Sequence, residues 1–364
     1  MTLAERLRAR IEARGPLTFR DWMEAALYDP RGGYYRRRDL ARWGASGDYR
    51  TSPERTPLFA AAFARHFAAL HERLGSPESW TILEAGAGAG HFARAALETL
   101  ARDHRRVFAA TRYLIDEVGE DARERTAARL PDFAARFEFG SLERLGDGEL
   151  GAGLVFSNEL LDALPAHRVR RRGGRLLELF VGLDGAGNFA WVEQEPSSPR
   201  LAEYFVEQGV ELAEGQGAEV NLAAEEWIAR AARALARGFV VTVDYGAEAS
   251  ELYDPRLSPD GTLRAFRAHR FSDDPLADPG LQDITTTVNW TRIKKAGESA
   301  GLRLLTHERQ DRFLLRAGLL EQLERLSALA PDEAARAQLR LAARDMILPG
   351  GMAESFQVLV QERP

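Results

Sequence analysis

The fold is decided by the stretch Thr81-Ile82-Leu83-Glu84-Ala85-Gly86-Ala87-Gly88-Ala89-Gly90, in which a short apolar run stops at an acid and three alternating glycines. An alanine-rich helical segment follows, so the order predicts a strand, a glycine turn and a helix. In an open α/β sheet such a turn lies at the carboxyl end of a strand, where the missing Cβ atoms let the backbone approach a ligand. The start of the helix adds free N–H groups. We therefore expect a nucleotide-like ligand here.

The spacing of the glycines separates two kinds of nucleotide site. A dinucleotide fingerprint that begins at Gly86 needs a glycine at position 91, where the chain has His91. The pattern ExGxGxG is complete, and it is the one that enzymes using S-adenosylmethionine carry. We therefore predict that Glu84, Gly86, Gly88 and Gly90 bind this cofactor. A plain flexible turn and a dinucleotide dehydrogenase are the less favoured interpretations.

The rest of the chain continues an α/β pattern. From Trp80 to about Asn158 strands alternate with helices, as in a parallel sheet with crossover helices. Further strands are expected at 238–243, 302–306 and 355–361.

Two acids end the second predicted strand, at 112–117. Asp116 and Glu117 stand where a nucleotide fold places an acid that accepts hydrogen bonds from the ribose hydroxyls. Alternation along the strand does not decide between them, and we favour Glu117 because it is the last residue of the strand. After the third strand, at 136–139, Ser141 and Leu142 are expected to border the adenine.

A second group of polar residues follows the fourth strand, at 153–157. Asn158, Glu159 and Asp162 lie at the same carboxyl-end rim as the glycine turn. At positions i and i+3 the two acids would share one face of a helical turn. Acids also occur at helix starts for purely structural reasons, and that interpretation stays open.

Composition and charge exclude several classes of site. The 364 residues contain no cysteine, so disulfides, thiolate metal sites and cysteine nucleophiles are excluded, and no metal is expected. A net charge of -6 argues against a nucleic-acid surface, and the basic runs at 36–38 and 168–172 are interpreted as solvated faces. No apolar run reaches the roughly 18 residues of a membrane span. Glu5 and Glu12 are unusual in a transit peptide, so a soluble cytoplasmic protein is expected.

The chain is predicted to divide into two parts, an N-terminal cap and a larger nucleotide-binding domain. Residues 1–75 form an N-terminal helical cap with a site-covering loop at 47–54, and residues 76–364 form the nucleotide-binding domain. Insertions at about 166–222, which begins as an antiparallel ribbon, and at about 247–285 are expected to form a subdomain on the substrate side.

These pieces together resemble the MidA family of class I S-adenosylmethionine-dependent methyltransferases, relatives of the mitochondrial arginine methyltransferase that assists assembly of respiratory complex I. The resemblance runs nearly end to end. Beyond the glycine turn, it rests on the motifs Ala26-Leu27-Tyr28-Asp29-Pro30, Gly33-Tyr34-Tyr35, Gly47-Asp48-Tyr49, Thr51-Ser52-Pro53-Glu54, Asn158-Glu159, Asp162-Ala163-Leu164-Pro165, Asp244-Tyr245-Gly246, Asp274-Pro275-Leu276, Pro279-Gly280, Asp283-Ile284-Thr285 and Gly351-Met352.

The resemblance implies a Rossmann-like, seven-stranded sheet with an antiparallel last strand, S-adenosylmethionine as donor and protein arginine as acceptor. It also makes the loop with Thr51 and Ser52 a wall of the cofactor site. We expect Glu159 and Asp162 to hold the acceptor guanidinium, with Asn158 nearer the donor. The resemblance implies a complex I-like subunit as partner, and the sequence leaves room for a homodimer.

One departure from the family concerns the acceptor side. Thr287 stands where relatives often carry histidine, so the role of that histidine cannot be transferred to this chain. Two other interpretations remain open: a non-catalytic assembly factor that binds S-adenosylmethionine, and a methyltransferase of small molecules.

Overall fold

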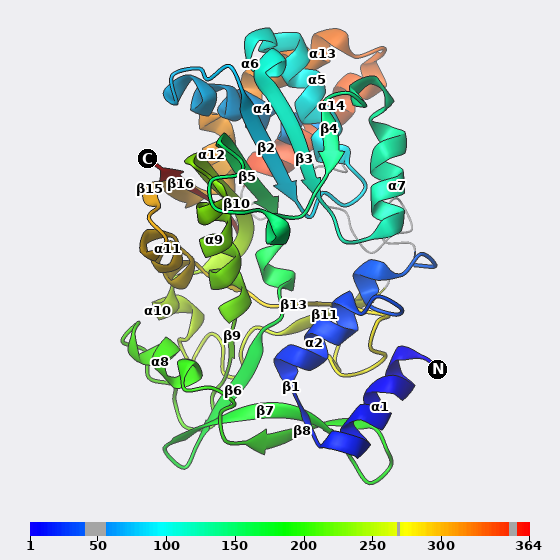
Figure 1. Cartoon of the computed structure of the whole chain (residues 1–364), viewed down its shortest axis with the longest axis vertical. Helices are drawn as coiled ribbons and strands as arrows, with labels where there is room; N and C mark the ends of the chain where they lie inside the picture. Colours follow the sequence, from blue (N-terminus) through cyan, green and yellow to red (C-terminus); the bar gives the residue numbers. More distant parts are fainter. Residues whose placement is uncertain (41–55, 268–269, 349–354) are drawn as a thin grey trace.

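The computed structural model describes residues 1–40, 56–267, 270–348 and 355–364. Its centre is a largely parallel sheet (Figure 1). In spatial order the main path has the strands β15 (Arg303–Arg309), β16 (Phe356–Arg363), β10 (Arg237–Ala247), β5 (Ala152–Asn158), β2 (Trp80–Ala85), β3 (Thr111–Asp116) and β4 (Phe137–Phe139). The last strand in sequence, β16, is antiparallel to both β10 and β15. The predicted α/β fold is confirmed; one addition is the short β14 (Val288–Asn289), which pairs with β10.

Helices cover both faces of this sheet because apolar residues occupy successive positions of its strands, and successive side chains point to opposite faces. Ile82 and Leu154 belong to the core on one face, and their neighbours Leu83 and Val155 belong to the core on the other. The first core includes residues of α4 (Pro57–Arg73), α5 (His91–Asp103), α6 (Arg105–Ala110), α12 (Gln310–Arg316), α13 (Leu319–Leu329) and α14 (Glu333–Ile347). The second includes residues of α9 (Leu222–Ala234) and α11 (Trp290–Ser299).

A second sheet lies below the first in Figure 1 and contains the predicted antiparallel ribbon. Its strands are β1 (Leu17–Thr18), β6 (His167–Arg172), β7 (Arg175–Leu183), β8 (Phe189–Gln194) and β9 (Gly217–Val220). The sequence did not reveal β1, whose two residues pair with Val181 and Phe180 of β7. The helices α1 (Leu3–Arg14) and α2 (Phe19–Tyr28) form the N-terminal cap and pack against β7 of this sheet. Oγ1 of Thr18 caps α2 by accepting the amide of Asp21 at 3.1 Å.

The second insertion, predicted at about 247–285, contains a small third sheet. The strands of this sheet are β11 (Arg264–Arg267), β12 (Arg270–Ser272) and β13 (Asp283–Thr285). The same insertion also contains the short helix α10 (Ala249–Leu252). Ala265 and Ile284 of this sheet share a core with Trp22 and Leu27 of α2. The N-terminal cap and the second insertion are therefore packed together. The helix α4, which the sequence assigned to the cap, packs in the core of the central sheet, and the boundary near residue 75 stays a prediction.

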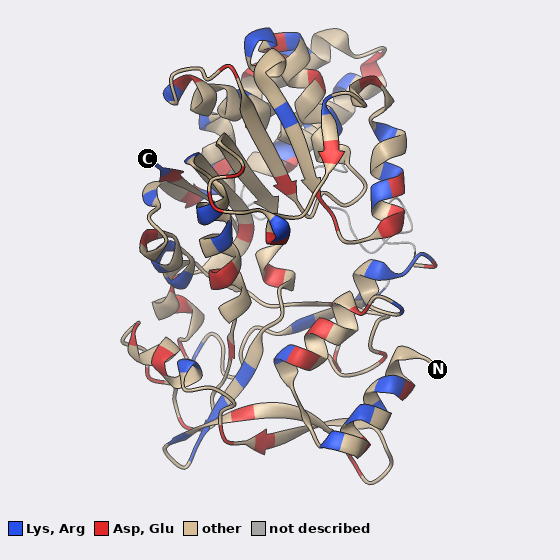
Figure 2. Cartoon of the chain, in the orientation of Figure 1, with Lys and Arg blue, Asp and Glu red and all other residues tan. Residues whose placement is uncertain are grey.

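Charged residues of both signs are interspersed over the chain (Figure 2). The basic run in β6 illustrates this, because its arginines have carboxylate partners: Arg168 with Glu219 and Asp260, Arg170 with Asp260 and Glu193, Arg171 with Glu211, and Arg172 with Glu193. Two further α-helices are α7 (Glu120–Arg129) and α8 (Arg200–Val206). Within the described ranges, no helix combines the length and the apolar character needed to cross a membrane.

Candidate functional site

The glycine turn after β2 adopts backbone conformations that only glycine takes readily. The φ angles of Gly86, Gly88 and Gly90 are 74°, 54° and 76°, all in the left-handed region. A Cβ added at Gly90 would lie 2.8 Å from Cγ2 of Thr126 on α7, so a larger residue would push the turn and this helix apart. The hydroxyl of Thr126 also donates to the carbonyl of Gly88 at 3.1 Å. The turn is therefore held open and rigid at the rim of the sheet.

The two acids at the end of β3 have separate partners. Glu117 accepts the amide of Gly88 at 2.8 Å through Oε2 and the amide of Gly119 at 2.8 Å through Oε1. Asp116 accepts the amide of Leu142 at 2.8 Å. Glu117 thus lies against the glycine turn, whereas Asp116 fixes the segment with Ser141 and Leu142, and this favours the prediction that Glu117 binds the ribose.

Glu84 lies beneath the glycine turn. Its side chain is buried and accepts a hydrogen bond from the Tyr113 hydroxyl at 2.7 Å. Burial raises the pKa of Glu84 to about 8, an effect that the Tyr113 hydrogen bond partly offsets. A direct contact between Glu84 and the cofactor stays a prediction that this burial does not favour.

The segment after β5, residues 159–164, is called the rim turn. Its predicted geometry is wrong, because Glu159 and Asp162 do not share one face of a helical turn. Glu159 has a left-handed φ of 53°, and only Leu161–Ala163 form a single 3₁₀ turn. The cause lies in β10, where the carbonyl of Val243 accepts the amide of Glu159 at 2.9 Å and so fixes the chain before the turn begins.

The two predicted catalytic acids have different surroundings. Asp162 is 4% exposed, and its Oδ2 accepts a hydrogen bond from the Tyr245 hydroxyl at 2.5 Å. Its Oδ1 is buried with no hydrogen-bond partner in the described part of the chain. Burial raises the pKa of Asp162 to about 7. Glu159 is half-buried, and Oε1 of its carboxylate accepts from Nδ2 of Asn158 at 3.2 Å.

Two tyrosines of the N-terminal cap, Tyr28 and Tyr35, contact the rim turn and the neighbouring strand β13. Tyr28 stacks on Tyr35 with ring centres 5.3 Å apart, and its hydroxyl donates to the carbonyl of Ala163 in the rim turn at 3.1 Å. The Tyr35 hydroxyl donates to Oδ1 of the buried Asp283 at 2.8 Å. The sequence motifs around these residues supported the family resemblance, but no role was predicted for them because their partners lie far away in the chain.

Arg264 brings a positive charge to this cluster. Its guanidinium carbon lies 4.7 Å from the centre of the Tyr245 ring, and its Nη2 donates to the hydroxyl of Thr287 at 2.8 Å. Thr287, the residue that departs from the family pattern, therefore orients an arginine beside Tyr245. Sequence reasoning did not single out Arg264, since no local motif marks it.

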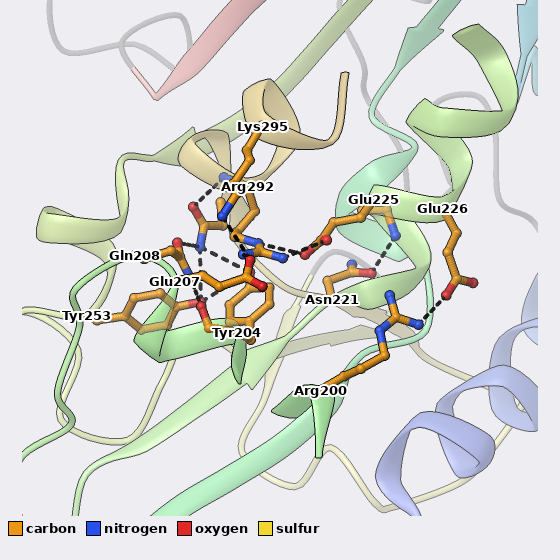
Figure 3. A network of polar contacts seen from close by, with 12 residues as sticks. Arg200, Tyr204, Glu207, Gln208, Asn221, Glu225, Glu226, Tyr253, Arg292 and Lys295 are labelled. Carbon is orange, nitrogen blue, oxygen red and sulfur yellow. Dashed lines mark hydrogen bonds and ion pairs between the residues drawn. The ribbon is translucent and has the colours of Figure 1, made fainter. Parts of the chain in front are cut away.

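Asn221 holds the rim turn from another side. Its Nδ2 donates to the carbonyl oxygens of Leu161 and Leu164, both at 3.1 Å, while its Oδ1 accepts the amide of Ala224 and caps α9. Figure 3 shows Asn221 at the start of α9, beside Glu225.

A network of ion pairs keeps α9 in place (Figure 3). Arg292 of α11 donates from Nε and Nη2 to the two carboxylate oxygens of Glu225, each at 2.9 Å, and from Nη1 to Glu207 at 2.6 Å. Its guanidinium also lies over the ring of Tyr204. Because a bidentate pair has a defined geometry, the network fixes the distance between α9 and α11, and with it the position of Asn221.

The residues present fit S-adenosylmethionine. Left-handed glycines open the backbone at the end of β2, and a Cβ at Gly86 would lie 3.2 Å from Cδ1 of Leu160 in the rim turn. The strands β3 and β5 flank β2 on either side; Glu117 directly follows β3, and Asn158 is the last residue of β5. Thr51 and Ser52 lie outside the described residues. In the described ranges, no group of three or more histidine, aspartate or glutamate side chains could hold a metal ion.

Comparison with known proteins identifies a family. Residues 62–307 match a family model described as "Putative S-adenosyl-L-methionine-dependent methyltransferase". A protein from Burkholderia thailandensis, described as a "likely methyl transferase" and crystallised with S-adenosyl-homocysteine, is 32% identical, with a TM-score of 0.87 over 99% of this chain and 92% of that one.

Two curated relatives have names that state an activity. The relative from Drosophila melanogaster is named protein arginine methyltransferase NDUFAF7 homolog, mitochondrial, and is 28% identical over 91% of this chain and 78% of its own. The human protein arginine methyltransferase NDUFAF7, mitochondrial, is 25% identical over 95% of this chain and 80% of its own.

These names contradict the prediction of a cytoplasmic protein, because the curated relatives are named as mitochondrial. The prediction was wrong for a physical reason. An intracellular address is read by receptors from a short segment, and neither overall composition nor fold carries that information.

Proposed function

The chain belongs to the family of S-adenosyl-L-methionine-dependent methyltransferases, and from this premise we propose that it methylates an arginine side chain of a partner protein. The names of the curated relatives support an arginine acceptor. The family membership already gives the methyl donor. The arginine acceptor is the new part of the proposal, and the geometry of the site has to support it.

The observation that carries the proposal is the convergence of carboxylates at the rim. Burial first, and then the negative charges of Asp283, Asp162, Glu117 and Glu24, raise the pKa of Tyr28 well above its usual value. Several acids therefore lie around one tyrosine and outnumber the guanidinium of Arg264 beside them, so we infer a negative potential at this place. A guanidinium is cationic and planar and matches carboxylates in bidentate fashion, so an arginine side chain fits this field better than a neutral acceptor does.

The proposed roles follow from the two carboxylates of the rim turn. Glu159, half-buried and steadied by Asn158, holds the guanidinium and aims one nitrogen. Asp162 offers the buried Oδ1, which takes the proton that this nitrogen loses. S-adenosylmethionine, when bound, supplies a methyl group already activated by a sulfonium, so the chain need only position the acceptor, accept the proton and exclude water. Glu117 and the glycine turn would hold the cofactor.

Labelled methyl transfer tests the proposal. Extract from the source organism lacking this protein is incubated with labelled S-adenosylmethionine and the purified chain, and the labelled protein is hydrolysed and examined for methylarginine. We expect one or few labelled proteins, and a loss of label of at least about a hundredfold with Asp162→Asn or Glu159→Gln. Glu138→Gln, at an exposed site in β4, is the matched control and should label normally.

Other outcomes would contradict the proposal. Cofactor binding without transfer to anything would identify a non-catalytic assembly factor. Label in small molecules, with none in protein, would identify a small-molecule methyltransferase. Full activity of both Asp162→Asn and Glu159→Gln would show that the acids of the rim turn do not carry the reaction.

A further inference from the structure

Asp244, at the rim end of β10, is fully buried and accepts hydrogen bonds from the backbone of the rim turn. Its Oδ2 receives the amides of Leu160, Leu161 and Asp162 at 3.3, 2.9 and 3.4 Å. Its Oδ1 receives the amide of Tyr245 at 2.9 Å. One carboxylate therefore satisfies the free N–H groups at the start of the rim turn, groups that would be costly to bury without an acceptor.

The next residue, Tyr245, contacts the side chain of Asp162 in the same turn. Its hydroxyl donates to Oδ2 of Asp162, and its ring lies against the guanidinium of Arg264. Of the two carboxylate oxygens of Asp162, Oδ1 is then the one that has no hydrogen-bond partner among the described residues. The pair Asp244-Tyr245 thus fixes both the backbone and one carboxylate oxygen of Asp162.

We propose that Asp244 and Tyr245 are positioning residues for methyl transfer: Asp244 fixes the backbone of the rim turn, and Tyr245 orients the carboxylate of Asp162 so that Oδ1 is presented to the acceptor. This inference rests on the proposed function, because it assigns the two residues to the reaction of Asp162. Neither residue touches the acceptor in this assignment.

The two residues act on the ionisation of Asp162 in opposite directions. Both oxygens of Asp244 receive N–H donors, so a proton on either oxygen would face a donor. Burial and the charge of Asp162 raise the pKa of Asp244, but its N–H donors favour its ionised form, so Asp162 is the member of the pair that takes up a proton first as the pH falls. The ionised form of Asp162, present above its pKa of about 7, is the form that accepts the proton in methyl transfer. The charge on Asp244 then disfavours the ionised form of Asp162, whereas the Tyr245 hydroxyl stabilises that form.

Other charged and titratable groups also face Asp162, and they stay unchanged in the variants below. Among the described residues they are Tyr28 of α2, Arg264 of β11 and Asp283 of β13, and Glu159 of the rim turn faces the neighbouring Asp244. The variants must therefore be compared with the wild-type chain under identical conditions.

Titration of Asp162 tests the inference without an acceptor. The carbonyl stretch of protonated Asp162 is followed by infrared spectroscopy against pH, and it is assigned by its loss in Asp162→Asn. We expect the midpoint to rise by about one pH unit in Tyr245→Phe, which loses one hydrogen bond, and to fall by about one unit in Asp244→Asn, which loses one charge. Asp184→Asn, in the exposed β7–β8 turn, is the control and should not move it.

The same variants are then assayed for methyl transfer. The acidic limb of the pH profile of kcat/KM should move in the same two directions, and kcat should fall at least about tenfold while the affinity for S-adenosylmethionine stays within about twofold. Midpoints that stay fixed, or that move in one direction in both variants, would overturn the inference. If Asp244→Asn does not fold, Tyr245→Phe alone decides, because the titration midpoint of Asp162 in this variant either rises or stays fixed. Failure of the proposed function would instead appear as a wild-type chain that transfers no methyl group to arginine.

Discussion

At the scale of single residues, the glycine turn depends on both a left-handed backbone and a close neighbour. Gly90 has a φ of 76° and packs on Thr126 of α7, whereas Gly187 in the β7–β8 turn has a φ of 80° and no atom within 4 Å of an added Cβ. The two glycines carry the same backbone strain on substitution, and only Gly90 has the steric conflict. They therefore form a matched pair.

We expect Gly90→Ala and Gly187→Ala each to lower the free energy of unfolding by about 1–2 kcal/mol for the left-handed backbone. Gly90→Ala should in addition weaken the binding of S-adenosylmethionine at least about tenfold, because the turn must move away from α7. Chemical denaturation and calorimetric titration measure the two effects. Equal cofactor affinities in both variants would contradict the role of the turn.

Glu84 makes stability depend on pH. Its pKa is about 8 in the folded chain, against the ordinary value of 4.5, so the folded chain keeps a proton that the unfolded chain has lost between these values. The free energy of unfolding should therefore fall as pH rises from 4.5 to about 8, by about 1.4 kcal/mol for each unit of difference.

Glu84→Gln tests this, because glutamine stays neutral and still offers an oxygen to Tyr113. We expect the variant and the wild-type chain to have similar stability near pH 5, and the variant to be the more stable one near pH 8. Urea denaturation at both pH values measures the difference. A parallel pH dependence in the two proteins would show that Glu84 is ionised in the folded chain.

At the scale of elements, the rim turn is held by segments from four parts of the chain. Asp244 of β10 binds its amides, and Asn221 of α9, Thr286 after β13 and Tyr28 of α2 bind its carbonyl oxygens. The cap, both insertions and the central sheet therefore meet at one short turn. Its geometry follows from their assembly and not from its own sequence.

Asn221→Asp separates the two roles of Asn221. An aspartate still caps α9 by accepting the amide of Ala224, but it cannot donate to Leu161 and Leu164 and repels their carbonyl oxygens. We expect kcat for methyl transfer to fall at least about tenfold, with a loss of stability of about 1–3 kcal/mol. Asp332→Asn, at the cap of α14, is the control and should leave kcat unchanged. An unchanged kcat in Asn221→Asp would contradict the importance of this contact.

At the scale of the whole molecule, acids from different segments gather around Tyr28 at the rim, although positive and negative residues are interspersed along the chain (Figure 2). We expect kcat/KM for a cationic protein acceptor to fall roughly tenfold between low salt and about 1 M salt, where the Debye length is about 3 Å. The main change should be in KM, since salt weakens the approach of the acceptor and not the chemical step.

Steady-state kinetics over a salt series measures this effect. Glu24→Gln removes an exposed acid that faces Tyr28 and should lessen the dependence on salt, and the affinity for S-adenosylmethionine serves as the internal reference. A value of kcat/KM that does not change with salt would favour a neutral acceptor.

Local signals explain what could be predicted. The run from Thr81 to Gly90 encodes its strand by apolar residues and its turn by glycine, and both signals act within a few residues. The predicted helical face of Glu159 and Asp162 failed because Val243, more than eighty positions away in β10, takes the amide of Glu159 and fixes the chain before the turn begins. The strand β1 was missed because two residues carry no periodicity, and they form a strand only because β7 lies beside them.

The sequence by itself determined the α/β fold, the main strands of the central sheet, the cofactor class and the family, since these follow from periodicity, glycine spacing and ordered motifs. Only the tertiary structure decided which of Asp116 and Glu117 lies at the glycine turn, that Glu84 is buried beneath it, and that Asp244, Tyr245, Tyr28 and Asn221 surround Asp162. Those contacts join side chains far apart in the chain, and such pairs become neighbours only when the cap, the insertions and the sheet pack together.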